Sequence, residues 1–536
     1  MLDHNVVVLG GSLFVWRIYK RLEPCSIPAT LLLLAAIPAC LVAHVKDQYS
    51  SIVLAAISVY ATFWISLLLF VVQYRISPFH PLAKFPGPFV CKITKIVVAN
   101  KYRNGEARAF FPEVHDRYGD VVRIGPNELS FRHADAITSI LIKEPLPKGP
   151  YYVTRVPKDA YQLDGMVDFA QHAQRRKLWN KAVTPAAIKD YAEMLKGVLA
   201  DLVRAFEERK GEIVDISAWM GYTSIDFMGH MAYSQSFGLL KAGCDILGLL
   251  DAQAKGAEAI TWMSHIPWIV GPLMKLPPSG PFKVLLELAT KLTRDRIVRG
   301  ASSKDLFHFL HAEDEPEDQR PSEKSVEADG VLAVGAGSDT AATALSHLFY
   351  FFMRSPECKR RLQVEIDSTF PAGEETTDFS QQSDSMPYLN ACIRPAIEFD
   401  YMPPSSFVPE DTQVSVNIPL LHRDPRYFYP LPNEFWPDRF LNQATYVTPS
   451  GETITKEQLV HDRSAFLPFS AGPQNCAGRA IALQEVRAVL CAVLQRFDIE
   501  KAEGFDLDDW DRNLKDCYVT HRGPLMVKIK HRILSS

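Results

Sequence analysis

The N-terminal part of the chain carries two long uncharged runs, which set residues 1–76 apart from the rest. One run occupies residues 27–45 and the other residues 52–74. A helix needs roughly 20 apolar residues to cross a bilayer, and two such runs in succession do not form a cleaved signal peptide. The pattern therefore predicts a membrane anchor over residues 1–76 with two spans. A pair of helices buried in a soluble core remains the alternative.

Charged residues predict how the two runs lie in a membrane. The outer flanks are basic and contain Arg17, Lys20, Arg21, Arg75 and Lys84. The link between the runs carries no net charge. By the positive-inside rule this is a helical hairpin with both flanks in the cytosol. An earlier apolar stretch, residues 6–16, is only about 17 Å long as a helix, so we expect it to be interfacial or a partial span.

A short proline-rich segment follows the anchor, and the pattern then changes. Residues 77–89 contain four prolines and a glycine, which predicts a stiff hinge. After it, apolar positions recur at helical spacing, most clearly in residues 187–208, 322–353 and 357–370. The sequence therefore predicts a large, mainly helical domain behind the hinge.

Strand patterns are fewer. Alternation predicts a hairpin in residues 121–131 and a closing strand in residues 524–530. Another helix is expected to start near Cys476. We therefore expect a mainly α fold with a smaller β part, occupying residues 90–536 as one domain.

Composition excludes several classes of protein. The net charge of −4 gives no reason to expect nucleic-acid binding. The nine cysteines are scattered without a C-x-x-C pair, which indicates reduced thiols on the cytosolic side of a membrane. The chain has no N-x-S/T sequon. A membrane-bound hydrolase is disfavoured because neither a G-x-S-x-G nor an H-E-x-x-H motif occurs.

One cysteine stands in a distinctive setting, the sequence FSAGPQNCAG of residues 469–478. Gly472 and Gly478 permit a tight turn and the close approach of a flat ligand. Cys476 lies where a helix begins, and the free N–H groups there favour a thiolate. A single thiolate suits a metal whose other ligands come from a porphyrin. A buried structural cysteine is the alternative.

The spacing of Phe469, Gly472, Cys476 and Gly478 resembles the haem-binding signature of the cytochrome P-450 family, most closely its fungal membrane-bound members. The resemblance extends from about Phe85 to the C-terminus. It implies a cytochrome P-450 fold behind the membrane anchor, with residues 90–536 as a haem-thiolate monooxygenase domain. It also implies that Cys476 binds the iron of haem b, iron protoporphyrin IX.

Two further blocks fit the same resemblance. His172 and Arg176 look like the helix residues that reach a haem propionate, although a basic helix face is often only solvated. Residues 336–340, AGSDT, resemble the oxygen-activating motif of the family's central helix. Gly337 would leave room for oxygen, and Asp339 and Thr340 would deliver protons. An ordinary helix bent by a threonine back-bond is the alternative.

Two departures from the family pattern stand out. Gln474 occupies a position where the family usually has a basic residue, and it donates a hydrogen bond without a charge. The family's E-x-x-R element is also altered, because Pro395 and Glu398 replace its glutamate and arginine. Arg439, in FWPDRF, would complete that network, and Glu398 is a candidate partner for it. The chain is then either a degenerate, inactive relative or the product of a local deletion or gene-model error.

The resemblance implies a function and its partners. We expect insertion of one oxygen atom from O2 into a lipophilic small molecule, a secondary metabolite such as a terpenoid. Electrons would come from NADPH through a separate NADPH-cytochrome P-450 reductase. The protein would lie in the endoplasmic reticulum membrane with its catalytic domain in the cytosol. A non-catalytic haem-binding or scaffold protein remains the alternative, and the sequence does not identify the substrate.

Overall fold

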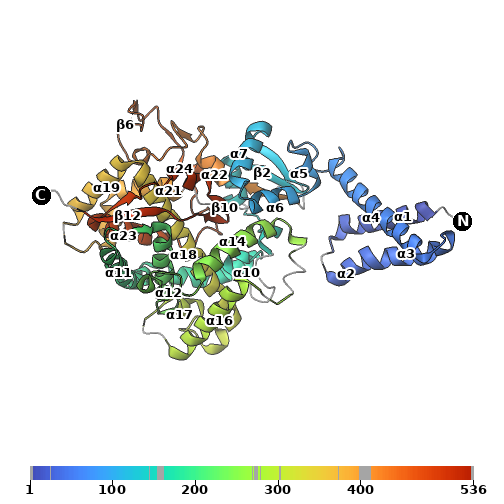
Figure 1. The fold of residues 1–536 in the computed structure, drawn as a ribbon, viewed down its shortest axis with the longest axis horizontal. Helices are drawn as coiled ribbons and strands as arrows, with labels where there is room; N and C mark the ends of the chain where they lie inside the picture. Colours follow the sequence, from blue (N-terminus) through green and yellow to red (C-terminus); the bar gives the residue numbers. More distant parts are fainter. Residues whose placement is uncertain are drawn as a thin grey trace.

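The chain folds into a small N-terminal helical bundle at one end of an elongated molecule and a larger body at the other end (Figure 1). The computed structural model describes residues 4–24, 26–143, 145–153, 162–268, 270, 276–277, 279–300, 303–371, 373–397 and 412–532.

The N-terminal bundle, called the anchor bundle below, comprises residues 4–76. Its segments are α1 (His4–Leu22), α2 (Ile27–Leu31), the π-helical η1 (Leu32–Ala36), α3 (Ile37–Val45), η2 (Lys46–Gln48) and α4 (Ile52–Ile76). Among the described residues, two helical stretches are long and apolar enough to cross a membrane, Ile27–Gln48 and Ile52–Ile76. Both coincide with the runs that the sequence predicts as spans, although α4 extends two residues further.

The larger body is mostly helical. Its first helices are α5 (Phe89–Ile93), α6 (Ile96–Arg103), α7 (Ala107–Tyr118), α8 (Asp135–Ile137), η3 (Thr138–Lys143), α9 (Pro150–Val153), η4 (Leu163–Gly165), α10 (Phe169–Ala182), α11 (Pro185–Glu208), α12 (Ile216–Tyr233), α13 (Leu239–Ala242) and α14 (Leu249–Ser264). The later ones are α16 (Pro281–Arg299), α17 (Leu306–Leu310), η5 (Glu317–Gln319), α18 (Glu323–Arg354), α19 (Pro356–Thr369), α20 (Phe379–Asp384), α21 (Pro387–Ile397), α22 (Ile418–His422), η6 (Pro437–Phe440), η7 (Arg463–Ala465), α23 (Arg479–Arg496) and α24 (Leu507–Arg512).

The β part consists of small sheets. Its strands are β1 (Val121–Gly125), β2 (Glu128–Phe131), β3 (Ile213–Asp215), β4 (Gln413–Val416), β5 (Phe428–Tyr429), β6 (Thr445–Val447), β7 (Thr453–Thr455), β8 (Val460–His461), β9 (Phe497–Lys501), β10 (Lys515–Cys517), β11 (Val519–His521) and β12 (Met526–His531). Two sheets have three strands, in the orders β1-β2-β4 and β3-β12-β9. The second of these joins distant parts of the chain, because β12 pairs with both β3 and β9.

The core lies where the long helix α18 crosses α12, with α11 and α23 packed beside them. Nearly all of α12 is buried, including Trp219 and Phe227. A helix that is apolar on every side can be stable only when other helices surround it, which explains its central place. On α18, burial is concentrated between Ala341 and Tyr350.

The predicted elements are largely confirmed. α11, α18 and α19 match the three predicted helices within two residues at each end, and β12 matches the closing strand. The predicted hairpin is β1 and β2, which pair antiparallel from Val121 opposite Phe131. α23 begins at Arg479, three residues after Cys476. Residues 6–16, expected to be interfacial or a partial span, belong to a 19-residue helix within the anchor bundle.

A buried arginine links the anchor bundle to the body. The Arg123 side chain on β1 is 1% exposed, and its Nη2 donates to the carbonyl oxygens of Arg75 (3.0 Å) and Pro126 (2.8 Å). The same nitrogen lies 3.3 Å from Nε2 of His80. Burial, together with the charge of Arg123, lowers the pKa of His80 to about 4, so the ring is neutral at pH 7. Its Nδ1 accepts a hydrogen bond from the backbone N–H of Leu82 (3.1 Å), so Nε2 is the nitrogen that carries the proton.

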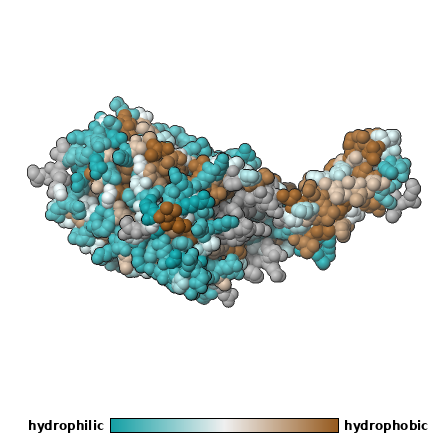
Figure 2. Space-filling view, turned by 90° about the horizontal axis from the view of Figure 1, so that it is seen from below, coloured by the Kyte–Doolittle hydropathy of each residue, from teal (hydrophilic) through white to brown (hydrophobic). Residues whose placement is uncertain are grey.

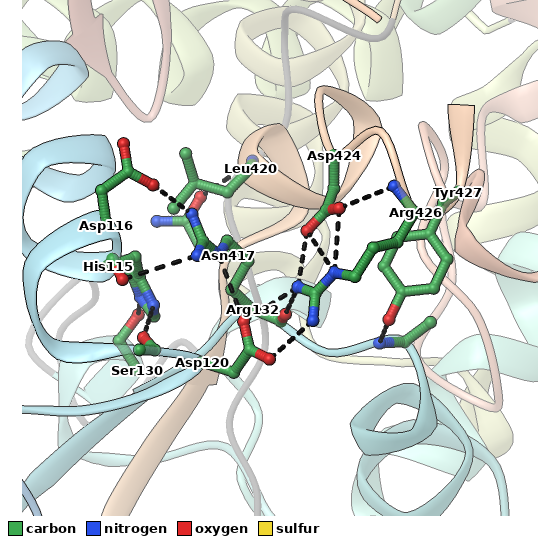
Figure 3. Close-up of polar contacts among 12 residues, drawn as sticks. His115, Asp116, Asp120, Ser130, Arg132, Asn417, Leu420, Asp424, Arg426 and Tyr427 are labelled. Carbon is green, nitrogen blue, oxygen red and sulfur yellow. Dashed lines mark hydrogen bonds and ion pairs between the residues drawn. The ribbon is translucent and has the colours of Figure 1, made fainter. Parts of the chain in front are cut away.

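A second polar network holds α7 to the first sheet and to the segment after β4 (Figure 3). The Arg426 guanidinium donates to both carboxylate oxygens of Asp120, at 2.7 and 2.8 Å, and also to Asp424. Nearby, the buried His115 ring bridges the carbonyl oxygen of Gly119 (3.0 Å) and the hydroxyl of Ser130 (2.8 Å).

The buried His115 should make the body sensitive to acid. Burial lowers the pKa of His115 from its ordinary 6.5 to about 4. Between these values the unfolded chain binds a proton that the folded chain does not, so the free energy of unfolding falls as the pH falls from 6.5 toward 4. The contribution amounts to about 2 kcal/mol between pH 7.5 and pH 5.

Denaturant unfolding at these two pH values tests this prediction. His115→Asn should lose about 2 kcal/mol less than the parent protein on acidification, whatever its stability at pH 7.5. Ser130→Ala keeps the imidazole and should retain the parent's acid sensitivity. An equal acid sensitivity of His115→Asn and the parent would show that His115 does not carry the effect.

Candidate functional site

An internal cavity of about 310 Å³ lies between α18 and the segment that contains Cys476. Helices α10, α12 and α23 and the segment η3 complete its walls. Most lining side chains are apolar, among them Leu163, Val183, Met231 and Leu332. Pockets of this size with apolar walls and a few converging polar groups are typical of sites for small organic ligands and cofactors.

The Cys476 loop is held in place by its own backbone. The Cys476 N–H donates to the carbonyl oxygen of Phe469 (3.0 Å), and the Asn475 N–H donates to that of Gly472 (3.2 Å). Gly472 adopts a φ of +73°, and a Cβ there would lie 1.8 Å from the carbonyl oxygen of Leu141. Only glycine fits this position, because η3 presses directly against the loop.

The two glycines of the loop differ in their structural role. Gly478 has a φ of −84° and immediately precedes α23. A Cβ at Gly478 would meet no atom within 4 Å, and Gly478 lines the cavity. The absence of a side chain at Gly478 therefore leaves cavity space open, as expected for the approach of a flat ligand, whereas Gly472 is required by packing.

Cys476 lines the cavity, and its side chain is exposed there. Burial raises the pKa of its thiol. Hydrogen bonds from the backbone N–H groups of Gly478 and Arg479, and the charge of Arg176, act in the opposite direction but do not prevail. The helix terminus therefore favours the thiolate, as the sequence predicts, but burial outweighs it in the protein alone. A metal cation facing the sulfur would deprotonate it.

The polar groups beside Cys476 fit the carboxylates of an iron porphyrin. Nε2 of Gln474 is buried and has no hydrogen-bond partner among the described residues, and Gln474 lines the cavity. Arg176 also lines it and donates to the backbone and side-chain oxygens of Asn475, at 2.5 and 2.8 Å. A bound carboxylate would give Gln474 the acceptor it lacks.

His172 and Arg176 both line the cavity from α10. The sequence therefore places them correctly on one helix face. Burial and the charges of Lys148 and Arg176 lower the pKa of His172 to about 4, so its ring is neutral at pH 7. Its contribution to a bound carboxylate would be a hydrogen bond and not a charge. Lys148, which the sequence reasoning did not single out, lines the same cavity.

The opposite wall is α18, where Ala336, Gly337 and Thr340 face the cavity. The Thr340 hydroxyl donates to the carbonyl oxygen of Ala336 (2.8 Å), the back-bond considered as the alternative, and its lone pairs still face the cavity. A Cβ at Gly337 would lie 2.4 Å from Sδ of Met228 on α12. The missing side chain therefore makes room for Met228, which also lines the cavity, and not only for oxygen as expected.

Asp339 lies elsewhere than the sequence leads one to expect. It is not among the described residues that line the cavity. Its Oδ1 accepts a hydrogen bond from Nη1 of Arg522 at 3.0 Å, and this guanidinium also contacts the Thr343 hydroxyl. Arg522 follows β11 and is 183 residues away in sequence, so no local pattern could have identified it as a partner.

The altered E-x-x-R block retains helical structure. α21 includes Pro395 near its C-terminal end, and Glu398 lies outside the described residues, as does any contact that it makes with Arg439. The N-terminus of α21 is fixed independently of this block. The Glu365 carboxylate accepts hydrogen bonds from the backbone N–H groups of Tyr388 (2.8 Å) and Leu389 (2.6 Å).

A different ion pair holds the segment that contains Arg439. Nη2 of Arg439 donates to the carbonyl oxygens of Pro430 and Leu431. Its neighbour Asp438 pairs with Arg361 on α19 through two hydrogen bonds, of 2.8 and 2.7 Å. Paired hydrogen bonds between charged groups are the strong kind, so Arg361 and Asp438 tie η6 to α19.

Comparisons with known proteins agree with this site. The family model described as "Cytochrome P450" matches residues 85–529. "Cytochrome P450 67" of Uromyces fabae is 29% identical, covering 94% of each chain. "Cytochrome P450 monooxygenase FCK2" of Fusarium pseudograminearum is 31% identical over 84% of this chain and 82% of its own. "Tryprostatin B 6-hydroxylase" of Neosartorya fischeri is 27% identical over 97% and 94%.

The two loop glycines should respond differently to substitution. Gly472→Ala should destabilise the protein even without cofactor, by roughly 3 kcal/mol or more, because backbone atoms collide at a positive φ. Gly478→Ala should change the stability of the cofactor-free protein by less than about 1 kcal/mol. It should nevertheless lower the haem bound per protein, because the methyl group enters the cavity.

Thermal unfolding of the cofactor-free proteins and the ratio of haem to protein after reconstitution measure the two effects separately. Equal destabilisation by both substitutions would contradict the distinction between a packing glycine and a space-leaving glycine.

Removing Arg361 should loosen η6. Arg361→Met leaves the mostly buried Asp438 carboxylate without its paired donor, so the free energy of unfolding should fall by about 1–2 kcal/mol. Arg360→Met, one residue earlier, removes only an exposed pair with Glu357 and should leave the free energy of unfolding nearly unchanged. Denaturant midpoints of the two variants check the difference, and equal midpoints would contradict it.

Proposed function

Because the chain belongs to the cytochrome P450 family and is a monooxygenase, we propose that it inserts one oxygen atom from O2 into a lipophilic small molecule of secondary metabolism. The observation that carries this proposal is the mostly apolar cavity between Cys476 and the Thr340 face of α18. A substrate in this cavity would lie next to the cofactor, against side chains that favour apolar compounds.

The residues present fit haem b, and each would act on a different part of it. Cys476 would ligate the iron as a thiolate. Gln474, Arg176 and His172 would hold the propionate carboxylates, through hydrogen bonds from Gln474 and His172 and through charge from Arg176. Gly478 leaves the space that the flat ring needs. When bound, the haem supplies the iron at which O2 is activated.

Proton delivery would fall mainly to α18. The Thr340 hydroxyl lines the cavity, and it would pass its proton onward after turning from the carbonyl oxygen of Ala336 toward the cavity, taking a replacement proton from water. Asp339 lies on the outer side of the helix in an ion pair with Arg522, which is 8% exposed. We propose that the Asp339 carboxylate passes protons to Thr340 through water that enters beside the β10–β11 hairpin. Arg522 would hold the carboxylate in position.

The remaining parts of the proposal concern partners and location. Electrons would come from NADPH through a separate NADPH-cytochrome P-450 reductase. The two apolar stretches Ile27–Gln48 and Ile52–Ile76 would anchor the protein in the endoplasmic reticulum membrane with the body in the cytosol. A lipophilic substrate, such as a terpenoid, could then enter from the bilayer. The relative named tryprostatin B 6-hydroxylase supports an organic small molecule as the substrate.

A second candidate is a haem-binding relative without catalytic activity. It is favoured by Pro395 in α21 and by Arg439, whose Nη2 donates to backbone carbonyl oxygens. The two candidates share the cofactor and differ in turnover.

Spectroscopy and turnover together test the proposal. The reduced protein with carbon monoxide should show the red-shifted band of a thiolate-ligated haem, and Cys476→Ala should abolish that band. Purified protein with reductase and NADPH should oxidise a lipophilic test compound. Haem without any product would favour the second candidate, and absence of haem would overturn both.

Thr340 should determine how much product is formed for each NADPH consumed. Thr340→Ala removes the hydroxyl that faces the cavity, so product formed per NADPH consumed should fall about tenfold or more. Haem content should stay within error of the parent, and Thr340→Ser should restore most of the yield because it keeps the hydroxyl. An unchanged yield in Thr340→Ala would remove Thr340 from the proton path.

A further inference from the structure

Helix α1 forms one wall of the anchor bundle. Its side chains Val8, Ser12 and Val15 are completely buried. They repeat at helical spacing and so define one inward face of α1. This face packs mainly on α4 and also on α3. α1 is therefore part of the bundle and not a detached N-terminal segment.

The opposite face of α1 is apolar and exposed. Val6, Leu9, Leu13 and Phe14 are 53%, 41%, 45% and 60% exposed. No charged residue occurs between His4 and Arg17. An interfacial helix carries a charged outer face, whereas this one has apolar side chains on both faces. On the face of the bundle that Figure 2 shows, much of the surface is apolar, with hydrophilic patches among it. An exposed apolar surface of this kind is suited to contact with lipid acyl chains.

The contact between α1 and α3 has the small residues typical of helices that pack in a bilayer. A Cβ at Gly11 would lie 2.9 Å from Cδ1 of Leu41, so glycine lets the two helices come close. The Ser12 hydroxyl donates to the carbonyl oxygen of Leu9 within its own helix (2.9 Å), so this buried polar group is satisfied without water.

The rings at one end fix the direction of α1. Trp16 lies 6.3 Å from the ring of Phe70 and 5.8 Å from that of Tyr74, and Nζ of Lys20 lies 3.7 Å from the Tyr74 ring. α1 and α4 therefore run in the same direction, with their C-terminal ends together beside the body. The N-terminal end of α1 lies toward the link between α3 and α4.

Length and charge agree with a complete crossing. α1 has 19 residues, about 28 Å of helix, in which residues 5–16 are uncharged and the long basic side chains of the last turns can reach the interface. Arg17, Lys20 and Arg21 gather at the C-terminal end, and no lysine or arginine occurs before them. Tryptophan and tyrosine rings at the same end match a membrane interface, and the basic side chains match the cytosolic surface.

We propose that α1 is a third membrane-spanning helix, with the N-terminus of the chain in the lumen and lipid against its outer face. The inference rests on the proposed anchoring of the two apolar stretches in the endoplasmic reticulum membrane. It replaces the interfacial position expected for residues 6–16 and turns the predicted hairpin into a bundle of three spans.

Glycosylation mapping of the full chain tests the proposal, because the chain lacks any N-x-S/T sequon and an added sequon is therefore a clean reporter. One variant carries a neutral N-terminal extension with an N-x-T sequon. A second carries the same reporter inserted after Gln48, in the link between α3 and α4, and a third carries it after Ser536. All three are expressed in eukaryotic cells, and the mass shift removed by endoglycosidase is measured.

We expect glycosylation of the N-terminal and Gln48 reporters and none of the C-terminal reporter. Glycosylation at Gln48 without glycosylation at the N-terminus would overturn the third span while leaving the two-span anchor intact. Absence of glycosylation at all three sites would overturn the proposed anchoring itself, and the third span with it.

A charged substitution sharpens the test. Leu13→Arg places a charge on the exposed face in the middle of α1 and should strongly reduce N-terminal glycosylation, because arginine is costly at this depth. Leu22→Arg, at the cytosolic end, should leave N-terminal glycosylation unchanged. Equal glycosylation of the parent and Leu13→Arg would show that residue 13 does not face lipid, against the proposal.

Discussion

The close packing of α18 on α12 is the contact on which the rest of the body depends. Two glycines of α18 make it possible, because a Cβ at Gly330 would lie 2.0 Å from the Tyr233 hydroxyl and one at Gly337 would lie 2.4 Å from Met228. Since protein interiors are as dense as organic crystals, the helices can approach this closely only where side chains are missing. The position of α18 in turn sets the cavity wall that carries Thr340.

The cavity is complete only because a second close contact fixes its other wall. Gly472 brings the Cys476 loop against η3, so that the sulfur faces α18 across the cavity. Between these walls lie polar side chains that can form hydrogen bonds with a bound cofactor. Gln474 offers a buried donor, and His172 is neutral because burial and nearby cations lower its pKa. Such a site is organised before any ligand enters it.

The anchor bundle and the body are not connected by a loose tether. Arg123 reaches from β1 to the last turn of α4 and is almost completely buried there. A buried guanidinium is stable only when its donors find acceptors, and the carbonyl oxygens of Arg75 and Pro126 provide them. The orientation of the body relative to a membrane would therefore follow from the tilt of α4. This arrangement suits a site whose substrates come from the bilayer.

Much of this protein could be predicted from local sequence patterns. The long helices, the first hairpin and the two apolar runs follow from periodicity and spacing, which are properties of neighbouring residues. The resemblance carried by a few motif residues was enough to predict the family. His172, Arg176 and Thr340, which the resemblance suggests as site residues, all line the cavity, and their roles there stay predictions.

Contacts between distant residues could not be predicted in this way. The partner of Asp339 is Arg522, and η6 is tied to α19 by Arg361 and Asp438. The sequence alone also leaves open that α1 packs along α4, because a short apolar run is compatible with several positions at a membrane. By itself the sequence determined which segments form helices and which cysteine faces the cofactor site. Only the tertiary structure decided which charges meet and which glycines are packing sites, because those depend on segments that the fold brings together in space.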